Sequence, residues 1–170
     1  YCFEKLGIDY LFVDEADTFK NLAYTTHYNR VKGLGPKAGS KMALHLLFAT
    51  TYMHKLHKGD KGVIFSSGTP ITNSLVEMYN IFQFIRPNYM KSIDMNTFDS
   101  WASTFAEQSA QMEFDVTGKI KAQNCFRKFT NAPELSRMYA DIADVRDDTN
   151  THIDKPKAES HLINIAPDND

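Results

Sequence analysis

The sequence is short of cysteine, of long apolar runs and of net charge, and each shortage excludes a kind of protein. Two cysteines, Cys2 and Cys125, cannot form a zinc cluster by themselves, and so few thiols fit a reducing cytoplasm. No apolar run approaches the roughly 18 residues that cross a bilayer, which excludes an integral membrane protein. A net charge of -2 removes the strongest sign of a nucleic-acid-binding domain, a large basic excess, although local basic patches remain.

The remaining composition is typical of a chain that buries a core. Of 170 residues, 42% are hydrophobic, 12% aromatic and 24% charged, which argues against wholesale disorder. The length fits one domain of ordinary size. The chain opens at Tyr1 and ends at Asp170 directly after an apolar stretch, so we expect a soluble, cytoplasmic fragment of a longer polypeptide.

Two short apolar runs that flank a helical pattern predict a parallel strand-helix-strand unit. Residues 8–13 (IDYLFV) and 62–65 (GVIF) are bounded by acids and turn residues, which is typical of buried strands. Between them, three- and four-residue spacing marks one helix face: Met42, Leu46, Ala49, Met53 and Leu56. Strand, helix and strand in this order favour the βαβ unit of α/β proteins.

The second half of the chain predicts mainly helices. Helical spacing marks residues 75–85, 97–111 and 133–145, and Pro87 ends the first of these, with Thr72, Asn73 or Ser74 as its cap. The aromatic residues Phe98, Trp101 and Phe105 could stack on bases, but a stripe at this spacing is more often core. Residues 116–121 are typical of a turn, 146–159 of a linker, and 162–165 of a last strand.

Three acids follow the first predicted strand, where ligands of open α/β sheets bind. Asp14, Glu15 and Asp17 lie within four positions. One carboxylate at a strand end can hold a hydrated Mg²⁺ through water, and the next can deprotonate the water that attacks a γ-phosphate. In this chemistry, Asp14 would hold the hydrated metal ion and Glu15 would be the general base. The alternative is a solvated turn or a helix N-terminus that favours acids through its dipole.

Hydroxyl groups follow the second predicted strand. Residues 66–73 read SSGTPITN, so that Ser67, Gly68 and Thr69 would lie beside the acids if the two strands are neighbours. A hydrogen bond to Asp17 could then sense bound nucleotide. The alternative is an ordinary strand-to-helix turn in which Ser or Thr serves as a cap.

Together the two segments resemble motifs II and III of the superfamily-two helicase-like ATPases, specifically the Swi/Snf type. The first segment is VDEAD at residues 13–17, followed by Lys20-Asn21; Asp17 stands where this family usually has His. The second is SGTPITNSLVEMYNIFQFIRP at residues 67–87, whose matching positions are Gly68, Thr69, Pro70, Asn73, Leu75, Glu77, Met78 and Pro87. The resemblance implies an α/β fold with a partial RecA-like (P-loop NTPase) parallel sheet, flanking helices and a helical appendage.

The resemblance also implies roles, cofactors and domains. Asp14 would assist Mg²⁺, Glu15 would be the catalytic base, and Asp17 with Ser67, Gly68 and Thr69 would couple ATP to double-stranded DNA in the full-length parent. Residues 1–95 would be the C-terminal half of a first RecA-like domain, 96–150 a helical insertion, and 151–170 a linker and first strand of a second RecA-like domain. Residues 127–145 resemble the helical segment of bacterial and phage helicase-methylase polypeptides.

A basic loop precedes the central predicted helix and could hold a DNA phosphate. The candidate DNA-binding residues are Arg30, Lys32, Lys37, Lys41 and Asn73. The alternative is a solvated loop without a binding role, because most runs of charged residues are solvated surface segments. The loop is not a phosphate-binding P-loop, since no G-x-x-x-x-G-K-[ST] occurs in the sequence. We therefore expect that this chain alone does not hydrolyse ATP.

Two other functions stay open. The acids could be structural, in a non-catalytic interaction module, or they could bind the metals of a nuclease, although three acids in one tight turn rarely arrange two metals. The histidines form no convincing ligand set, and we expect His54 and His57 at the surface or at a helix end. An uncovered sheet edge in a truncated domain also predicts self-association.

Overall fold

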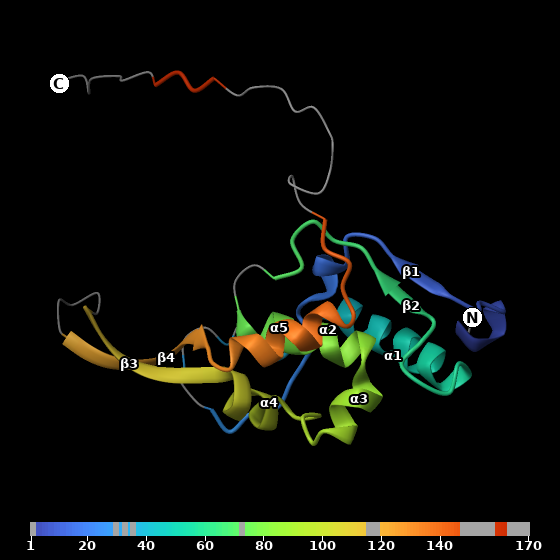
Figure 1. Cartoon of the computed structure of the whole chain (residues 1–170), viewed down its shortest axis with the longest axis horizontal. Helices are drawn as coiled ribbons and strands as arrows, with labels where there is room; N and C mark the ends of the chain where they lie inside the picture. Colours follow the sequence, from blue (N-terminus) through green and yellow to red (C-terminus); the bar gives the residue numbers. More distant parts are fainter. Residues whose placement is uncertain are drawn as a thin grey trace.

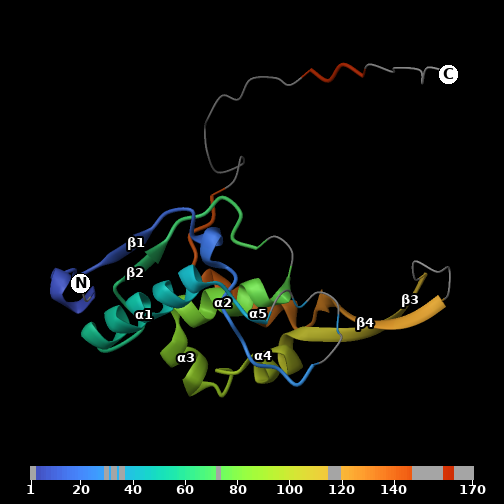
Figure 2. The same cartoon turned by 180° about the vertical axis from the view of Figure 1, so that it is seen from behind.

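In the computed structural model, a parallel strand pair lies beside a group of helices, and a long β-hairpin projects from the far side of those helices (Figures 1 and 2). The structure describes residues 3–28, 31, 34, 37–71, 74–114, 120–146 and 159–162. The elements in chain order are η1 (Phe3–Leu6), β1 (Leu11–Val13), η2 (Ala16–Phe19), α1 (Lys41–Leu56), β2 (Val63–Phe65), α2 (Leu75–Ile85), α3 (Pro87–Ser92), α4 (Phe98–Phe105), β3 (Ala106–Phe114), β4 (Ile120–Phe129) and α5 (Ala132–Ala140).

The predicted strand-helix-strand unit is confirmed. β1 pairs with β2 in parallel, with Leu11 opposite Val63 and Val13 opposite Phe65, and α1 connects the two strands. Each strand is shorter than predicted, with three residues. The chain enters α1 through Ser40, whose side chain accepts a hydrogen bond from the Ala43 amide at 3.1 Å and so caps the helix.

The strand pair is covered on one face. Leu11, Val13 and Phe65 pack against a small core made by α1 and α2. On the opposite face Phe12 is 71% exposed and its register partner Ile64 is 51% exposed. The prediction of buried strands is therefore wrong for this face, because the described helices cover the other face. Self-association through the sheet stays a prediction.

The buried face of α1 differs from the predicted one. Leu46 and Met53 are buried as expected, but Met42 and Leu56 are exposed. His54, expected at the surface or at a helix end, lies in the last turn of α1 but is buried. Its Nε2 donates a hydrogen bond to the Phe84 carbonyl oxygen at 2.8 Å. A carbonyl of α2 thus satisfies one ring nitrogen, which lets a histidine face the core.

The main core joins α2, α4, α5 and the base of the hairpin. Phe82, Phe98, Trp101 and Phe105 are its fully buried aromatic residues, so the prediction that the α4 aromatic stripe is core is confirmed. Helix α4 thus packs on α2.

A short helix that the sequence pattern did not predict follows α2. Pro87 ends α2 and begins α3, where its fixed φ suits a first turn. The Asp60 carboxylate accepts hydrogen bonds from the backbone amides of Asn88 and Tyr89, at 3.0 and 2.8 Å. The cap of α3 therefore comes from a loop 28 residues earlier in the chain, which a local pattern cannot reveal.

The prediction of helix through residue 111, and with it the all-helical appendage, is wrong. α4 ends at Phe105, and β3 pairs antiparallel with β4 from Ala106 opposite Phe129 to Phe114 opposite Ile120. α5 ends at Ala140, five residues before the predicted end. The expected linker and last strand lie almost wholly outside the described residues.

Tyr79 in this core is expected to make the protein lose stability at high pH. Burial, with a contribution from nearby Asp99, raises the pKa of Tyr79 to about 12, and its hydroxyl donates to the Asn96 carbonyl at 2.9 Å. The pKa of Tyr79 in the folded state lies above the ordinary value near 10. The neutral phenol therefore contributes fully to the free energy of unfolding below pH 10, and this contribution is lost as the pH rises towards 12. The difference between the two pKa values limits the loss of unfolding free energy to about 3 kcal/mol.

Urea unfolding between pH 9 and 12 measures this loss, and Tyr79→Phe is the control. The phenylalanine variant should start about 1 kcal/mol less stable, because it lacks the hydrogen bond, and should lose less stability over this range. Absorbance at 295 nm should show a tyrosine that titrates near pH 12 in the wild type and is missing in the variant. Equal alkaline losses in both proteins would contradict the assignment.

Candidate functional site

The ends of β1 and β2 bring the acids and the hydroxyls together. Beyond the strands, the Ser66 amide donates to the Val13 carbonyl at 2.8 Å, and the Ala16 amide donates to the Ser66 carbonyl at 3.0 Å. These bonds continue the parallel pairing past the last strand residues. The acidic loop (residues 14–17) and the hydroxyl loop (residues 66–70) therefore run side by side at one end of the pair.

A direct side-chain contact joins the two loops. Ser67 Oγ donates a hydrogen bond to Asp17 Oδ1 at 2.7 Å, and it accepts one from the Thr69 amide at 3.1 Å. Asp17 and Ser67 are half-buried, whereas Gly68 and Thr69 are exposed. The contact predicted between Asp17 and the hydroxyl loop is confirmed for Ser67; Thr69 contributes its backbone.

Asp14 and Glu15 present their carboxylates to solvent. Both residues are exposed, and Asp14 Oδ1 accepts a hydrogen bond from the Glu15 amide at 3.0 Å. Glu15 has φ 48° and ψ 48°, the left-handed region that residues with a Cβ rarely occupy. Such strain is concentrated at functional sites in proteins. The turn thus holds two adjacent acids in the open, immediately before η2.

The acidic loop suits a hydrated Mg²⁺ better than a cage of protein ligands. Mg²⁺ keeps several waters and takes one or two carboxylates plus substrate phosphates, and exposed Asp14 offers such an oxygen donor. Within the described part of the chain, which includes all three acids, no group of three His, Cys, Asp or Glu side chains could hold a metal ion. The three-acid nuclease arrangement gains no support from this geometry.

The candidate DNA-binding residues are described only in part. Lys37 donates a hydrogen bond from Nζ to the Tyr28 carbonyl at 2.9 Å, so it holds its own loop. Lys41 is exposed at the first position of α1. Arg30, Lys32 and Asn73 lie outside the described residues. Of the five candidates, the structure therefore describes only Lys37 and Lys41, and both are exposed.

Polar residues behind the acidic loop tie it to α2. Lys20 Nζ lies 3.5 Å from Glu77 Oε1, and Asn80 Nδ2 donates to the Lys20 carbonyl at 2.8 Å. Lys20 and Glu77 belong to the motifs noted in the sequence, but sequence reasoning gave them no role, and it passed over Asn80. One signal in the sequence could have indicated this role: Glu77 and Asn80 lie on the face of α2 that otherwise carries apolar core residues.

Further along, the same segment is tied to α4. Thr26 Oγ1 and the His27 amide donate to the Asp99 carboxylate, and His27 Nδ1 lies 2.7 Å from it. Partial burial acts to raise the pKa of Asp99, but the hydrogen bonds from Thr26 and His27 outweigh it and hold that pKa below its ordinary value. Residues 20–27 are thus fastened to two helices of the core.

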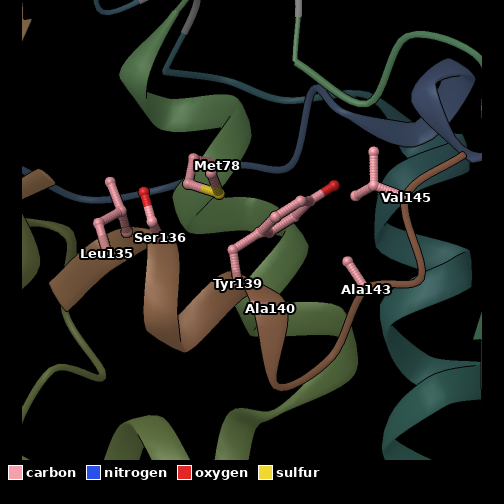
Figure 3. A pocket seen from close by; sticks show the side chains of 7 residues that line it. All are labelled: Met78, Leu135, Ser136, Tyr139, Ala140, Ala143 and Val145. Atoms are coloured by element: carbon pink, nitrogen blue, oxygen red, sulfur yellow. The ribbon is translucent and has the colours of Figure 1, made fainter. Parts of the chain in front are cut away.

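An apolar hollow of about 320 Å³ lies between α2, α5 and the segment after α5 (Figure 3). Its described lining is Met78, Leu135, Ser136, Tyr139, Ala140, Ala143 and Val145. None of these side chains is a carboxylate or a cation, and burial raises the pKa of Tyr139. The hollow thus contains none of the predicted site residues and lacks the charges that a triphosphate requires.

Comparison with protein families identifies the kind of protein. A model of the family described as a probable helicase domain matches residues 1–147. The chain belongs to this family. The match spans the acidic loop, the hydroxyl loop, the hairpin and α5 of this helicase domain. Comparisons with curated proteins and with solved structures find no match. Among the described residues, no helix is both long and apolar enough to span a bilayer.

Proposed function

We propose that this helicase-like domain supplies the hydrolytic acids and the coupling contact of an ATP-driven motor of the Swi/Snf type that acts on double-stranded DNA. The phosphate-gripping loop and the second RecA-like domain would come from other segments of the same protein. The hydrogen bond between Ser67 and Asp17 carries the proposal, because it joins the two motif-like segments at 2.7 Å across neighbouring parallel strands.

The positions of the side chains support a division of roles. Phosphoryl transfer needs positioned charge more than covalent chemistry, so two open acids can be its centre. Bound Mg²⁺-ATP would supply the electrophilic phosphorus and the metal charge. Asp14 would orient a water of the metal shell, and Glu15 would accept a proton from the attacking water. Asp17 is already held by Ser67 and would report changes in the acidic loop to the hydroxyl loop.

Replacement of Glu15 by glutamine in the full-length protein is expected to abolish hydrolysis and spare binding. Glutamine keeps the shape of the side chain but cannot take the proton, and loss of a general base typically costs at least about 100-fold. Release of phosphate from ATP, with and without double-stranded DNA, measures the rate. Binding of a fluorescent ATP analogue measures affinity, which should stay within about threefold.

Two further variants sharpen this test. Glu107→Gln changes an exposed carboxylate in β3 and should leave hydrolysis unchanged. Ser67→Ala should lower the stimulation by DNA more than the basal rate, since it removes the contact to Asp17. Normal hydrolysis in Glu15→Gln, or no nucleotide binding by the full-length protein, would instead favour the non-catalytic interaction module.

A further inference from the structure

Helix α2 is attached to both sides of the contact between Asp17 and Ser67. On one side, the hydroxyl loop precedes α2 in the chain by four residues. On the other side, η2 carries Asp17, and Lys20, the residue that follows η2, is bound to α2 through its carbonyl and its ammonium group. Asn80 Nδ2 also lies 3.5 Å from the Leu22 carbonyl. α2 thus holds the segment that follows Asp17 and comes shortly after Ser67 in the chain.

The residues that make this attachment are buried. The Glu77 side chain is 7% exposed, that of its partner Lys20 is 24% exposed, and Asn80 is almost fully buried. Buried polar groups of this kind contribute little net stability, but they tolerate few alternative geometries, because an unpaired charge or amide in the core is costly. Lys20, Glu77 and Asn80 therefore form a structure, here named the α2 brace, that specifies position more than it stabilises.

The surroundings of the α2 brace exclude a ligand site. The cavity beside it, lined by Lys20, Glu77 and Asn80 among others, has a volume of about 10 Å³. That is room for about one water molecule and for no organic ligand. The close packing favours a mechanical role for these side chains.

We infer that Glu77 and Asn80 are positioning residues for the acidic loop. They hold residues 20–22 against α2, and this fixes η2 and the carboxylate of Asp17 at the distance from Ser67 that the hydrogen bond requires. The α2 brace joins residues 20–22 to α2, and the Asp17–Ser67 bond joins the acidic loop to the hydroxyl loop. Without the α2 brace, the acidic loop keeps its bonds to Ser66 and Ser67 but loses the support behind η2, so its backbone opens more often. The importance of this for catalysis rests on the proposed function.

Amide hydrogen exchange tests the inference in the chain as it stands, without nucleotide. The probes are the amides of Ala16 and Thr69, whose acceptors are the Ser66 carbonyl and Ser67 Oγ. In Asn80→Ala and in Glu77→Gln, both amides should exchange at least ~10-fold faster than in the wild type. A charge exchange, Lys20→Glu with Glu77→Lys, should return most of the protection, which a merely disturbed core would not.

The matched control is Leu135→Ala, which removes a buried side chain of α5 outside the α2 brace. It should lower global stability without a selective effect on Ala16 and Thr69. Unchanged exchange in both brace variants, or an equal acceleration in the control, would overturn the inference. Should Asn80→Ala fail to fold, Glu77→Gln, which keeps the side-chain shape, decides alone.

A second arm separates this inference from the proposed function. In the full-length protein, Glu77→Gln should lower the maximal rate of ATP hydrolysis about 10-fold while the affinity for ATP changes little. If exchange is faster in the brace variants but Glu15→Gln leaves hydrolysis unchanged, the positioning role of Glu77 and Asn80 is supported and the hydrolytic role of the acidic loop is wrong. If hydrolysis depends on Glu15 but exchange is insensitive to Glu77 and Asn80, the positioning role falls.

Discussion

Replacement of Trp101 by alanine is expected to lower the free energy of unfolding by about 3–5 kcal/mol, the usual cost of deleting a large aromatic side chain from a core. Trp101 is completely buried, and its ring lies 5.5–6.3 Å from the rings of Tyr79, Phe98, Phe105 and Phe129. These residues belong to α2, α4 and β4, so the cavity would loosen the joint between the helices and the hairpin. Urea unfolding followed by circular dichroism measures the change.

Trp101→Phe is the matched variant for this experiment. The indole Nε1 of Trp101 is buried and has no hydrogen-bond partner in the described structure. Phenylalanine removes that unsatisfied donor, which offsets part of the lost packing, so we expect a cost below about 1.5 kcal/mol. A cost for Trp101→Ala similar to that for Trp101→Phe would mean that the ring is not the centre of this core.

Replacement of Gly39 by alanine is expected to cost about 2–5 kcal/mol. Gly39 has φ +67°, where a Cβ is unfavourable by about 1–2 kcal/mol. A Cβ would also overlap the backbone nitrogen of Ala23 and lie 2.8 Å from its Cα, and crowding of this kind adds about 1–3 kcal/mol. The neighbouring Ser40 amide donates to the Asn21 carbonyl at 2.7 Å, so the two segments cannot separate without losing a hydrogen bond.

Gly7 provides a control with the same backbone conformation and open space. Its φ is +66°, and a Cβ there would have no neighbour within 4 Å. Gly7→Ala should therefore cost about 1–2 kcal/mol, the conformational part alone. The difference between the two variants measures the close approach of residues 23 and 39. Equal costs would contradict that approach.

Features that depend on neighbours in sequence were predictable. The parallel strand pair and α1 follow from short apolar runs and from helical spacing, which are local signals. The start of α3 at Pro87 and the antiparallel ribbon were missed because their stabilising partners are distant: Asp60 caps α3, and β4 completes β3. The helical spacing of aromatic residues in α4 ends at Phe105, and no local pattern in residues 106–111 indicates that they pair with a later strand.

The same distinction holds for the candidate site. The contact between Asp17 and Ser67 was predictable because both residues follow strands that the pattern makes neighbours. The α2 brace was not, since Asn80 and the Lys20 carbonyl are 60 residues apart and no regular spacing joins them. The exposure of Phe12 and Ile64 was also not predicted, because an apolar run does not show whether helices cover one face of the strand or both.

The left-handed backbone at Glu15 has a consequence for protein engineering. Glycine or asparagine would occupy that conformation more easily, so a library selected only for heat resistance should enrich these residues at position 15. Such a selection would discard the carboxylate to which the proposed function assigns the role of general base. Retention of Glu15 would therefore indicate selection for activity, and its replacement by glycine or asparagine would indicate selection for stability. Sequencing counts at position 15 measure the balance between the two.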